Sequence, residues 1–158
     1  MKILIAVDGS ADALQAVQHV LALVRRGLAA ELVLANVQEP ASLYEMVVVH
    51  DADSIEELRR RAGADLLAPA EALLQEAGVP FESEVAGGDP QHVLVELAEN
   101  YGCHAIVMGA RGEVSSDFPS TGFGMATSLG GVAEAVLAHS PVPVTVVRAR
   151  PPGEVAGL

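Results

Sequence analysis

The sequence predicts an α/β fold: an open, five-stranded parallel sheet with helices on both faces. Short apolar runs alternate with segments in which apolar residues recur at the helical period, as in sheets whose parallel strands are joined by crossover helices. Hydrophobic residues make up 51% of the 158-residue chain and aromatic residues only 3%. Such an aliphatic core suits strands buried on both faces. One domain is expected over residues 1–148, with a loose tail at 149–158.

Five short segments have the composition or alternation expected of strands. They are residues 2–7, 31–37, 81–85, 105–108 and 142–147. Three helices are expected to begin at the capping residues Ser10, Ser54 and Asp89, and a fourth covers residues 132–139. Pro69 lies inside the helix that begins at Ser54 and predicts a kink or break there. Residues 39–53, with an apolar island at 46–49, match no element.

Composition and charge exclude several classes of protein. The formal net charge of −12 opposes non-specific binding to nucleic acid or to anionic membranes. No apolar run is long enough to span a bilayer, and the first residues enter a strand rather than a signal peptide, so cytoplasmic residence is expected. The single Cys103 permits no internal disulfide, and the five histidines lack the paired spacing of a metal site. No nucleophile–base pair stands out, so a dedicated enzyme is not expected.

Glycines mark two places where a phosphate group would fit. The fourth expected strand runs into the sequence GARG at 109–112, and the pair Gly130-Gly131 opens the last helix. Glycines let backbone N–H groups approach an anion, and a helix start adds unpaired donors and partial positive charge. In this strand–loop–helix context the glycines favour a phosphate cradle, with loop turns and close helix packing as the alternative. Arg111 is the cation of this loop that could face a phosphate, or else a solvated side chain.

Three segments together match a known family pattern. They are ILIAVDGS at 3–10, the spacing Gly109-x-x-Gly112, and LGGVAEAV at 129–136. Through them the chain resembles the nucleotide-binding universal stress proteins over essentially its whole length. The resemblance implies the strand order 3-2-1-4-5, whose switch point lies between the first and fourth strands. It also implies binding of ATP, ADP or AMP, with or without Mg²⁺. The net charge, in contrast, is the reason to expect no nucleic-acid or membrane partner.

The resemblance further implies which residues would hold the nucleotide. Asp8 and Ala6 would lie at its adenine and ribose end, and Val37 would contact the base. Met108 and Gly109 would contact the ribose and the backbone around it. The phosphates would be surrounded by Gly112, Gly130, Gly131 and Val132. Asp8 is equally suited to stabilising the turn that follows it, which is the alternative role for this side chain.

Two departures from the family pattern stand at the phosphate end. Seventeen residues separate Gly112 from Gly130 where the pattern has nine, and Gly131 replaces its Ser or Thr. The missing hydroxyl predicts weaker nucleotide binding than in relatives that carry it. The enlarged segment, 113–129, is expected to be either a mobile lid over the phosphates or a plain surface loop.

The expected function is that of a stress-response protein acting through nucleotide binding and dimerisation. Residues 142–147 are rich in valine and follow a proline, which favours an edge strand, and pairing with a second copy would satisfy such an edge. Homodimerisation of this kind is also common among the proteins that the chain resembles. A dimeric partner protein that binds no nucleotide and a slow ATPase are the alternatives left open.

Overall fold

The computed structural model describes residues 1–40, 52–111 and 129–149. Gly112, almost all of the segment 113–129 and the tail from residue 150 onward lie outside this part of the chain. The described elements are β1 (Lys2–Ala6), α1 (Ala11–Arg25), β2 (Glu31–Gln38), α3 (Ala52–Glu76), β3 (Phe81–Gly87), α4 (Pro90–Asn100), β4 (Ala105–Gly109), α5 (Gly131–His139) and β5 (Val144–Val147).

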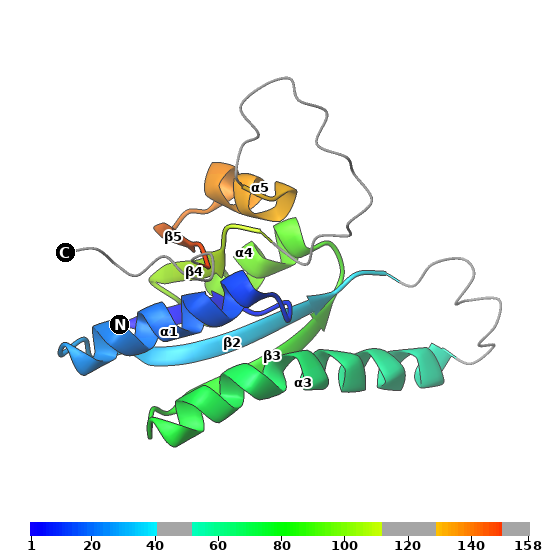
Figure 1. Ribbon diagram of the computed structural model, residues 1–158. Helices are drawn as coiled ribbons and strands as arrows, with labels where there is room; N and C mark the ends of the chain where they lie inside the picture. The colour runs from blue at the N-terminus through cyan, green and yellow to red at the C-terminus, as the bar shows by residue number, and fades with distance from the viewer. Residues whose placement is uncertain (41–51, 112–128, 150–158) are drawn as a thin grey trace.

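The strands form one parallel sheet in the order β3-β2-β1-β4-β5, which confirms the predicted fold class and strand order. Central strand β1 pairs with β2, where Ala6 lies opposite Ala35, and with β4, where Ile5 lies opposite Val107. From β1 the chain builds outward to β2 and β3, and it then returns to the other side of β1 to form β4 and β5 (Figure 1). The strand order therefore reverses between β1 and β4.

Helices cover both faces of the sheet, and alternate residues of β1 face opposite layers. Ile3 and Ile5 pack in one core with residues of α1 and α3, whereas Leu4 packs in the other with residues of α4 and α5. Figure 1 shows the same division, with α1 and α3 on one side of the strands and α4 and α5 on the other. The central strands are thus buried on both sides, as the aliphatic composition requires.

Two of the predicted helix caps form as expected. The Ser10 hydroxyl accepts a hydrogen bond of 3.1 Å from the Ala13 N–H at the start of α1. The Asp89 carboxylate accepts one of 3.2 Å from the Gln91 N–H, with Pro90 as the first residue of α4. Both caps satisfy N–H groups that have no acceptor inside their helices, so these helices begin at defined points next to the carboxyl ends of strands.

The predicted break at Pro69 is wrong, because α3 runs unbroken from Ala52 to Glu76 (Figure 1). Pro69 is exposed, while Leu67 and Ala70 beside it are buried in the core with α1 and the sheet. Packing of the apolar stripe therefore holds the helix together across the one hydrogen bond that proline removes. Although α3 is the longest described helix, neither it nor another helix of residues 1–40, 52–111 and 129–149 is long and apolar enough to cross a membrane.

The last strand is shorter than predicted: β5 begins at Val144 rather than at residue 142. The Val142 N–H donates to the Ser140 hydroxyl at 3.2 Å, and the Pro143 carbonyl accepts from the Ile106 N–H of β4 at 2.9 Å. Pro143 itself has no N–H to give to a ladder, so regular pairing starts one residue later. As predicted, the strand lies at an edge of the sheet.

Candidate functional site

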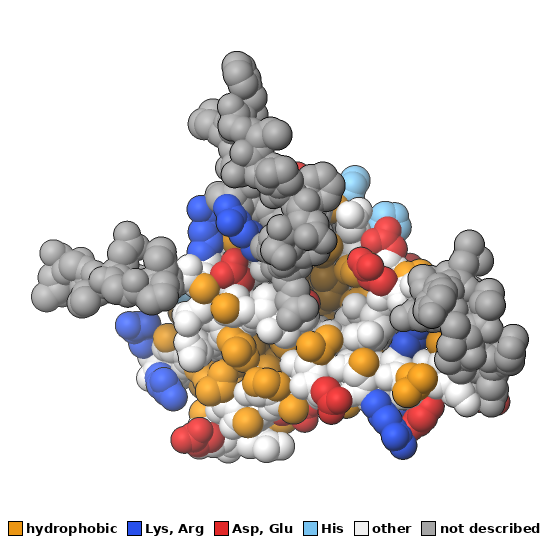
Figure 2. Space-filling model, turned by 45° about the vertical axis from the view of Figure 1, so that its right-hand side comes forward, with side chains coloured by type: hydrophobic (Ala, Val, Ile, Leu, Met, Phe, Trp, Pro, Cys, Tyr) orange, Lys and Arg blue, Asp and Glu red, His pale blue; other side chains and the backbone are white. Residues whose placement is uncertain are grey.

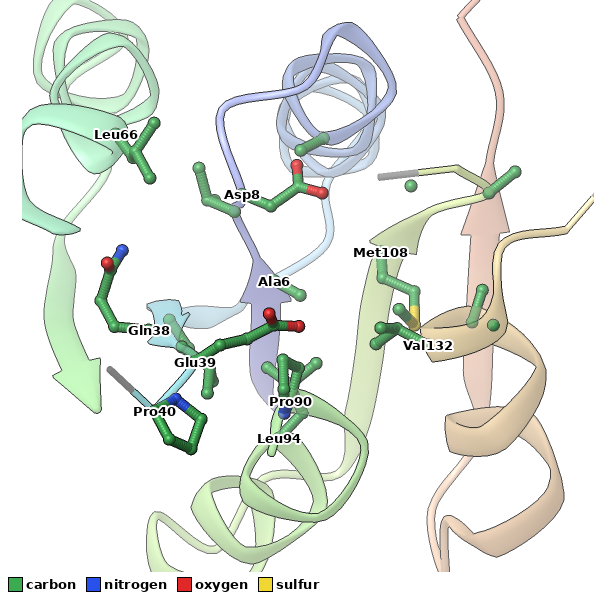
Figure 3. Close-up of a pocket in the computed structure, with 18 residues that line it drawn as sticks. Ala6, Asp8, Gln38, Glu39, Pro40, Leu66, Pro90, Leu94, Met108 and Val132 are labelled. Atoms are coloured by element: carbon green, nitrogen blue, oxygen red, sulfur yellow. The ribbon is translucent and has the colours of Figure 1, made fainter. Parts of the chain in front are cut away.

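A cavity of about 740 Å³ opens at the carboxyl ends of β1, β2 and β4, where the strand order reverses (Figure 3). This is the place where ligands of open parallel sheets bind. Its lining residues come from six parts of the chain: Ala6, Val7, Asp8 and Ala13; Ala35, Val37, Gln38, Glu39 and Pro40; Leu66; Pro90 and Leu94; Met108, Gly109 and Ala110; and Gly131, Val132 and Ala133. Segments far apart in the sequence are thus brought to one space.

Seven of the ten predicted site residues line this cavity. They are Ala6, Asp8, Val37, Met108, Gly109, Gly131 and Val132. Gly130 and Arg111 are not among the lining residues, although each is next in sequence to one that is. Gly112 lies outside the described residues. The predicted residues that do line it come from the ends of three strands and from the start of α5.

Asp8 both lines the cavity and stabilises a turn. Its Oδ1 atom accepts a hydrogen bond of 2.9 Å from the Ser10 N–H, which fixes the turn between β1 and α1. The residue is exposed, and Figure 3 shows its carboxylate above the end of β1. Both roles considered from the sequence are therefore compatible with one position of this side chain.

Gly109 is required by close packing at the end of β4. A Cβ atom there would lie 2.7 Å from the Asp12 Cβ and 2.9 Å from the Ala13 nitrogen. Because real Cβ atoms do not come so near to backbone, the end of β4 lies against the first turn of α1 only with glycine at this position. Close packing, which the sequence offered as the alternative role of the pair Gly130-Gly131, is thus found at Gly109 instead, since nothing lies within 4 Å of a Cβ added at Gly131.

Asp12 links the segments after β4 and β5 to α1 by hydrogen bonds, a role that the sequence did not indicate. Its Oδ2 atom accepts a hydrogen bond of 3.1 Å from the Arg111 N–H, and its Oδ1 atom accepts one of 2.8 Å from the Ala149 N–H. The segments that follow β4 and β5 are therefore both tied to the first turn of α1. In the sequence Asp12 is only an acidic residue early in a helix, where it is commonly explained by the helix dipole.

The start of α5 is the part of the site best suited to an anion. Gly130 is its N-cap and makes no side-chain capping bond. The Gly130 N–H donates to the Ala110 carbonyl at 2.7 Å, which joins the helix start to the end of β4. The N–H groups of Gly131 and Val132 have no acceptor within the helix, and both residues line the cavity. Two donors of the predicted cradle therefore suit a phosphate, while that of Gly130 is already used.

The opposite wall contains residues that sequence reasoning missed. Pro90 and Leu94 reach the cavity from α4 and Leu66 from α3, and Gln38 and Glu39 stand at the end of β2 (Figure 3). The helical residues are spaced as ordinary core positions, so nothing local distinguishes them. The Asp89-Pro90 pair predicts a helix start, but it carries no signal that Pro90 lines the cavity.

The buried amide of Asn36 stabilises this wall by two hydrogen bonds. Asn36 is 2% exposed, and its Nδ2 atom donates to the Val7 carbonyl at 2.8 Å. Its Oδ1 atom accepts from the Gln38 Nε2 atom at 2.7 Å. The first bond connects the ends of β1 and β2, and the second lies within β2. Both the nitrogen and the oxygen of this buried amide thus have a partner.

Sequence comparisons connect the chain to a family. The model of the universal stress protein family matches residues 1–148. The universal stress protein MJ0531 of Methanocaldococcus jannaschii is 29% identical over 147 residues, which cover 93% of this chain and 81% of that protein. The universal stress protein YxiE of Bacillus subtilis is 34% identical over 121 residues, or 70% of this chain and 79% of that protein.

Solved structures share the fold over nearly the whole chain. The hypothetical protein MJ0577 superimposes with a TM-score of 0.73 at 26% identity, covering 94% of this chain and 96% of that one. An Arabidopsis thaliana universal stress protein with AMP bound gives 0.66 at 20% identity, covering 95% and 92%. A universal stress protein in complex with cAMP gives 0.64 at 24% identity, covering 93% and 96%.

Proposed function

Since the chain belongs to the universal stress protein family, we propose that it binds ATP or a related adenine nucleotide in the cavity at the carboxyl ends of β1, β2 and β4. One observation carries the proposal: apolar residues and the uncapped start of α5 line the same space. The volume of about 740 Å³ suits a small-molecule ligand. The AMP and cAMP complexes of two proteins with this fold support the choice of ligand.

The proposed orientation follows from the chemistry of the two walls. Val37, Pro90 and Leu94 offer an apolar surface for a base, and Asp8 offers acceptor oxygens for an amino group or a ribose hydroxyl. The N–H groups of Gly131 and Val132 would face a phosphate. No group of three His, Cys, Asp or Glu side chains in the described ranges could hold a metal ion, so Mg²⁺ would come with the nucleotide.

Two measurements test the proposal. Small molecules released by denaturing the native protein are identified by mass spectrometry, and AMP is titrated calorimetrically with UMP as the control ligand. We expect a released adenine nucleotide and tighter binding of AMP than of UMP. Binding of neither ligand to protein freed of nucleotide would contradict the proposal.

A variant pair tests the location of the ligand. Val37→Tyr would fill the base end of the cavity and weaken AMP binding about tenfold or more. Val95→Tyr makes the same change at a half-buried position of α4 that does not line the cavity, and it should leave AMP affinity unchanged. Equal affinity in the two variants would place the ligand elsewhere.

Edge strand β5 favours a second role, in which the protein acts as a homodimer. Val144, Val146 and Val147 are only half-buried in a single chain, and an edge strand leaves backbone groups open to pairing. Antiparallel pairing of β5 with the β5 of a second copy would cover the valine side chains and satisfy the open backbone groups. Sedimentation velocity at micromolar concentration should show a dimer, and a profile with monomer alone would end this proposal. A dimer that binds no nucleotide would favour the role of a partner protein.

A further inference from the structure

A second cavity, of about 390 Å³, lies between the start of α3 and the carboxyl ends of β2 and β3. Figure 1 shows α3 lying along these strands, and Figure 2 shows acidic and basic side chains next to one another over this helix. The helix contributes Ile55, Glu56, Arg59 and Arg60 to the lining of this α3 cavity. Gln38 lines both the α3 cavity and the larger one, so the two cavities are neighbours.

The charged side chains in the described linings of the two cavities differ in sign. Those of the larger cavity are two carboxylates, Asp8 and Glu39. Those of the α3 cavity are two guanidinium groups, Arg59 and Arg60, and one carboxylate, Glu56. The described lining of the α3 cavity is thus positive, although the whole chain has a formal net charge of −12. A guanidinium group at a cavity suits a ligand with a phosphate or carboxylate group.

The two arginines differ in their partners. The Arg60 Nη2 atom lies 3.7 Å from the Glu56 Oε1 atom, and its Nη1 atom lies 3.3 Å from the Glu57 Oε2 atom. In contrast, the Arg59 Nη2 atom is buried and has no hydrogen-bond partner among the described residues. A buried donor of a charged group without an acceptor destabilises the fold. Because Arg59 itself lines the α3 cavity, an oxyanion bound there could supply the acceptor.

The strand side of the α3 cavity adds a backbone donor and an apolar surface. β3 is the outermost strand, and the Gly88 N–H donates to the Gln38 carbonyl of β2 at 3.0 Å. Successive N–H groups of a strand point to opposite sides, so the N–H of Gly87, which lines the cavity, points away from β2. Ile55 and Val85 add apolar side chains to the lining. The cavity thus combines donors for an anionic group with an apolar surface for the rest of a small molecule.

We infer that the α3 cavity binds a small organic anion, with the phosphate or carboxylate group of the ligand against Arg59 and its apolar part against Ile55 and Val85. The planar guanidinium can donate to two oxygens of such a group at once, which makes the pair both stronger and more specific than a single neutral hydrogen bond. This site differs from the proposed nucleotide site in its lining and in its charge, and it does not depend on nucleotide binding.

The test is an NMR titration of the wild-type protein with phenyl phosphate and, separately, with benzoate. Saturable shifts of the Arg59 Nε–H and Gly87 N–H signals are expected with at least one of the two anions, and the stronger binder shows which anionic group the site takes. Benzyl alcohol, which has the ring but no charge, is the control ligand and should cause no such shift. Equal shifts with benzyl alcohol, or none with either anion at millimolar concentration, would overturn the inference.

Variants then test the role of the guanidinium. Arg59→Gln should weaken anion binding about tenfold or more. Arg61→Gln is the matched control and should leave affinity unchanged, since Arg61 is an exposed arginine of the same helix that does not line the α3 cavity. Arg59→Lys keeps the charge but not the planar fork, so it should weaken binding about threefold or more without removing a charge on which folding could depend.

Two further results would overturn the inference. One is an affinity that is the same in the wild type and in both Arg59 variants. The other is a set of shifts confined to Gly131 and Val132, which would place the anion at the start of α5 and would leave the proposed nucleotide site intact.

Discussion

The two ends of the sheet differ in how their polar groups are satisfied. At the amino end such groups pair with neighbouring elements: the Lys2 N–H donates to the His104 Nδ1 atom at 3.0 Å, and the Tyr101 hydroxyl, at the end of α4, donates to Glu84 in the middle of β3 at 2.7 Å. The His104 N–H donates in turn to the Lys2 carbonyl at 2.7 Å, and the Lys2 ammonium lies 5.4 Å from the centre of the Tyr101 ring. At the carboxyl end lies the cavity of about 740 Å³.

Helix starts explain the difference between the ends. Helices α1, α4 and α5 each begin near the carboxyl end of the sheet, and the first two are capped by the side chains of Ser10 and Asp89. Gly130 gives α5 no such cap. Among these three helix starts, that of α5 therefore has no side-chain cap, and its Gly131 and Val132 line the cavity. This missing cap is the feature of the carboxyl end on which the proposed binding site depends.

The largest expected effect comes from adding a methyl group at the end of β4. Gly109→Ala should lower the free energy of unfolding by about 1–3 kcal/mol, because the new Cβ would overlap Asp12 and Ala13 of α1. Gly131→Ala is the matched control, since nothing lies within 4 Å of a Cβ added there, and it should change stability by less than about 0.5 kcal/mol. Urea unfolding measures both. Equal stabilities of the two variants would show that β4 does not press on α1.

The next effect concerns ligand affinity. Gly131→Ser restores the hydroxyl of the family pattern at the start of α5, and a hydrogen bond to a charged phosphate contributes about 1.5–3 kcal/mol. AMP should therefore bind about ten- to a hundredfold more tightly. Adenosine has no phosphate, so its affinity should stay the same. A calorimetric titration that shows no gain for AMP would mean that residue 131 does not face the phosphate.

The smallest expected effect lies at the amino end. Tyr101→Phe removes the hydrogen bond to Glu84 and should lower the free energy of unfolding by about 1 kcal/mol, without changing AMP affinity. Urea unfolding and AMP titration of the variant check the two parts of this expectation. A change in AMP affinity would show that the two ends of the sheet are coupled.

Tyr101 also makes the stability of the folded protein depend on pH in a predictable direction. The hydrogen bond to Glu84, together with burial and the charges of Glu84 and Glu82, raises the pKa of Tyr101 from 10.0 to about 12. Between these two values the folded protein therefore keeps the Tyr101 hydroxyl proton while the unfolded chain has lost it. The stabilisation that this group contributes is complete below pH 10 and is lost as the pH rises toward 12. Wild type should lose more stability than Tyr101→Phe over this interval. Equal losses of stability in the wild type and in Tyr101→Phe would contradict the assignment of this pH dependence to Tyr101.

The sequence predicted the sheet and one wall of the site for a physical reason. Strand ends and helix starts carry local signals, such as Asp8 with Gly9 after β1 or the glycine pair before α5. Their meeting place follows from the strand order, because the carboxyl ends of parallel strands lie at one edge of a sheet. For this reason Ala6, Met108 and Val132 line one cavity at this edge of the sheet.

The other wall had no such signal. Leu66 and Leu94 look like any core residue of a helix, and only the packing of α3 and α4 against the strand ends brings them to the cavity. The links made by Asp12 and Asn36 join segments that are distant in sequence, so no local pattern reveals them. The unbroken α3 likewise depends on tertiary packing, which overrides the helix-breaking tendency of Pro69.

Amide NMR spectra recorded during an AMP titration test the contrast between the two ends most directly. The N–H signals of Gly109, Gly131 and Val132 should shift as AMP is added, because these residues line the cavity. Those of Gly102 and His104, at the opposite end, should stay in place. Shifts confined to Gly102 and His104, or no shift at millimolar AMP, would contradict a nucleotide site at the carboxyl end of the sheet.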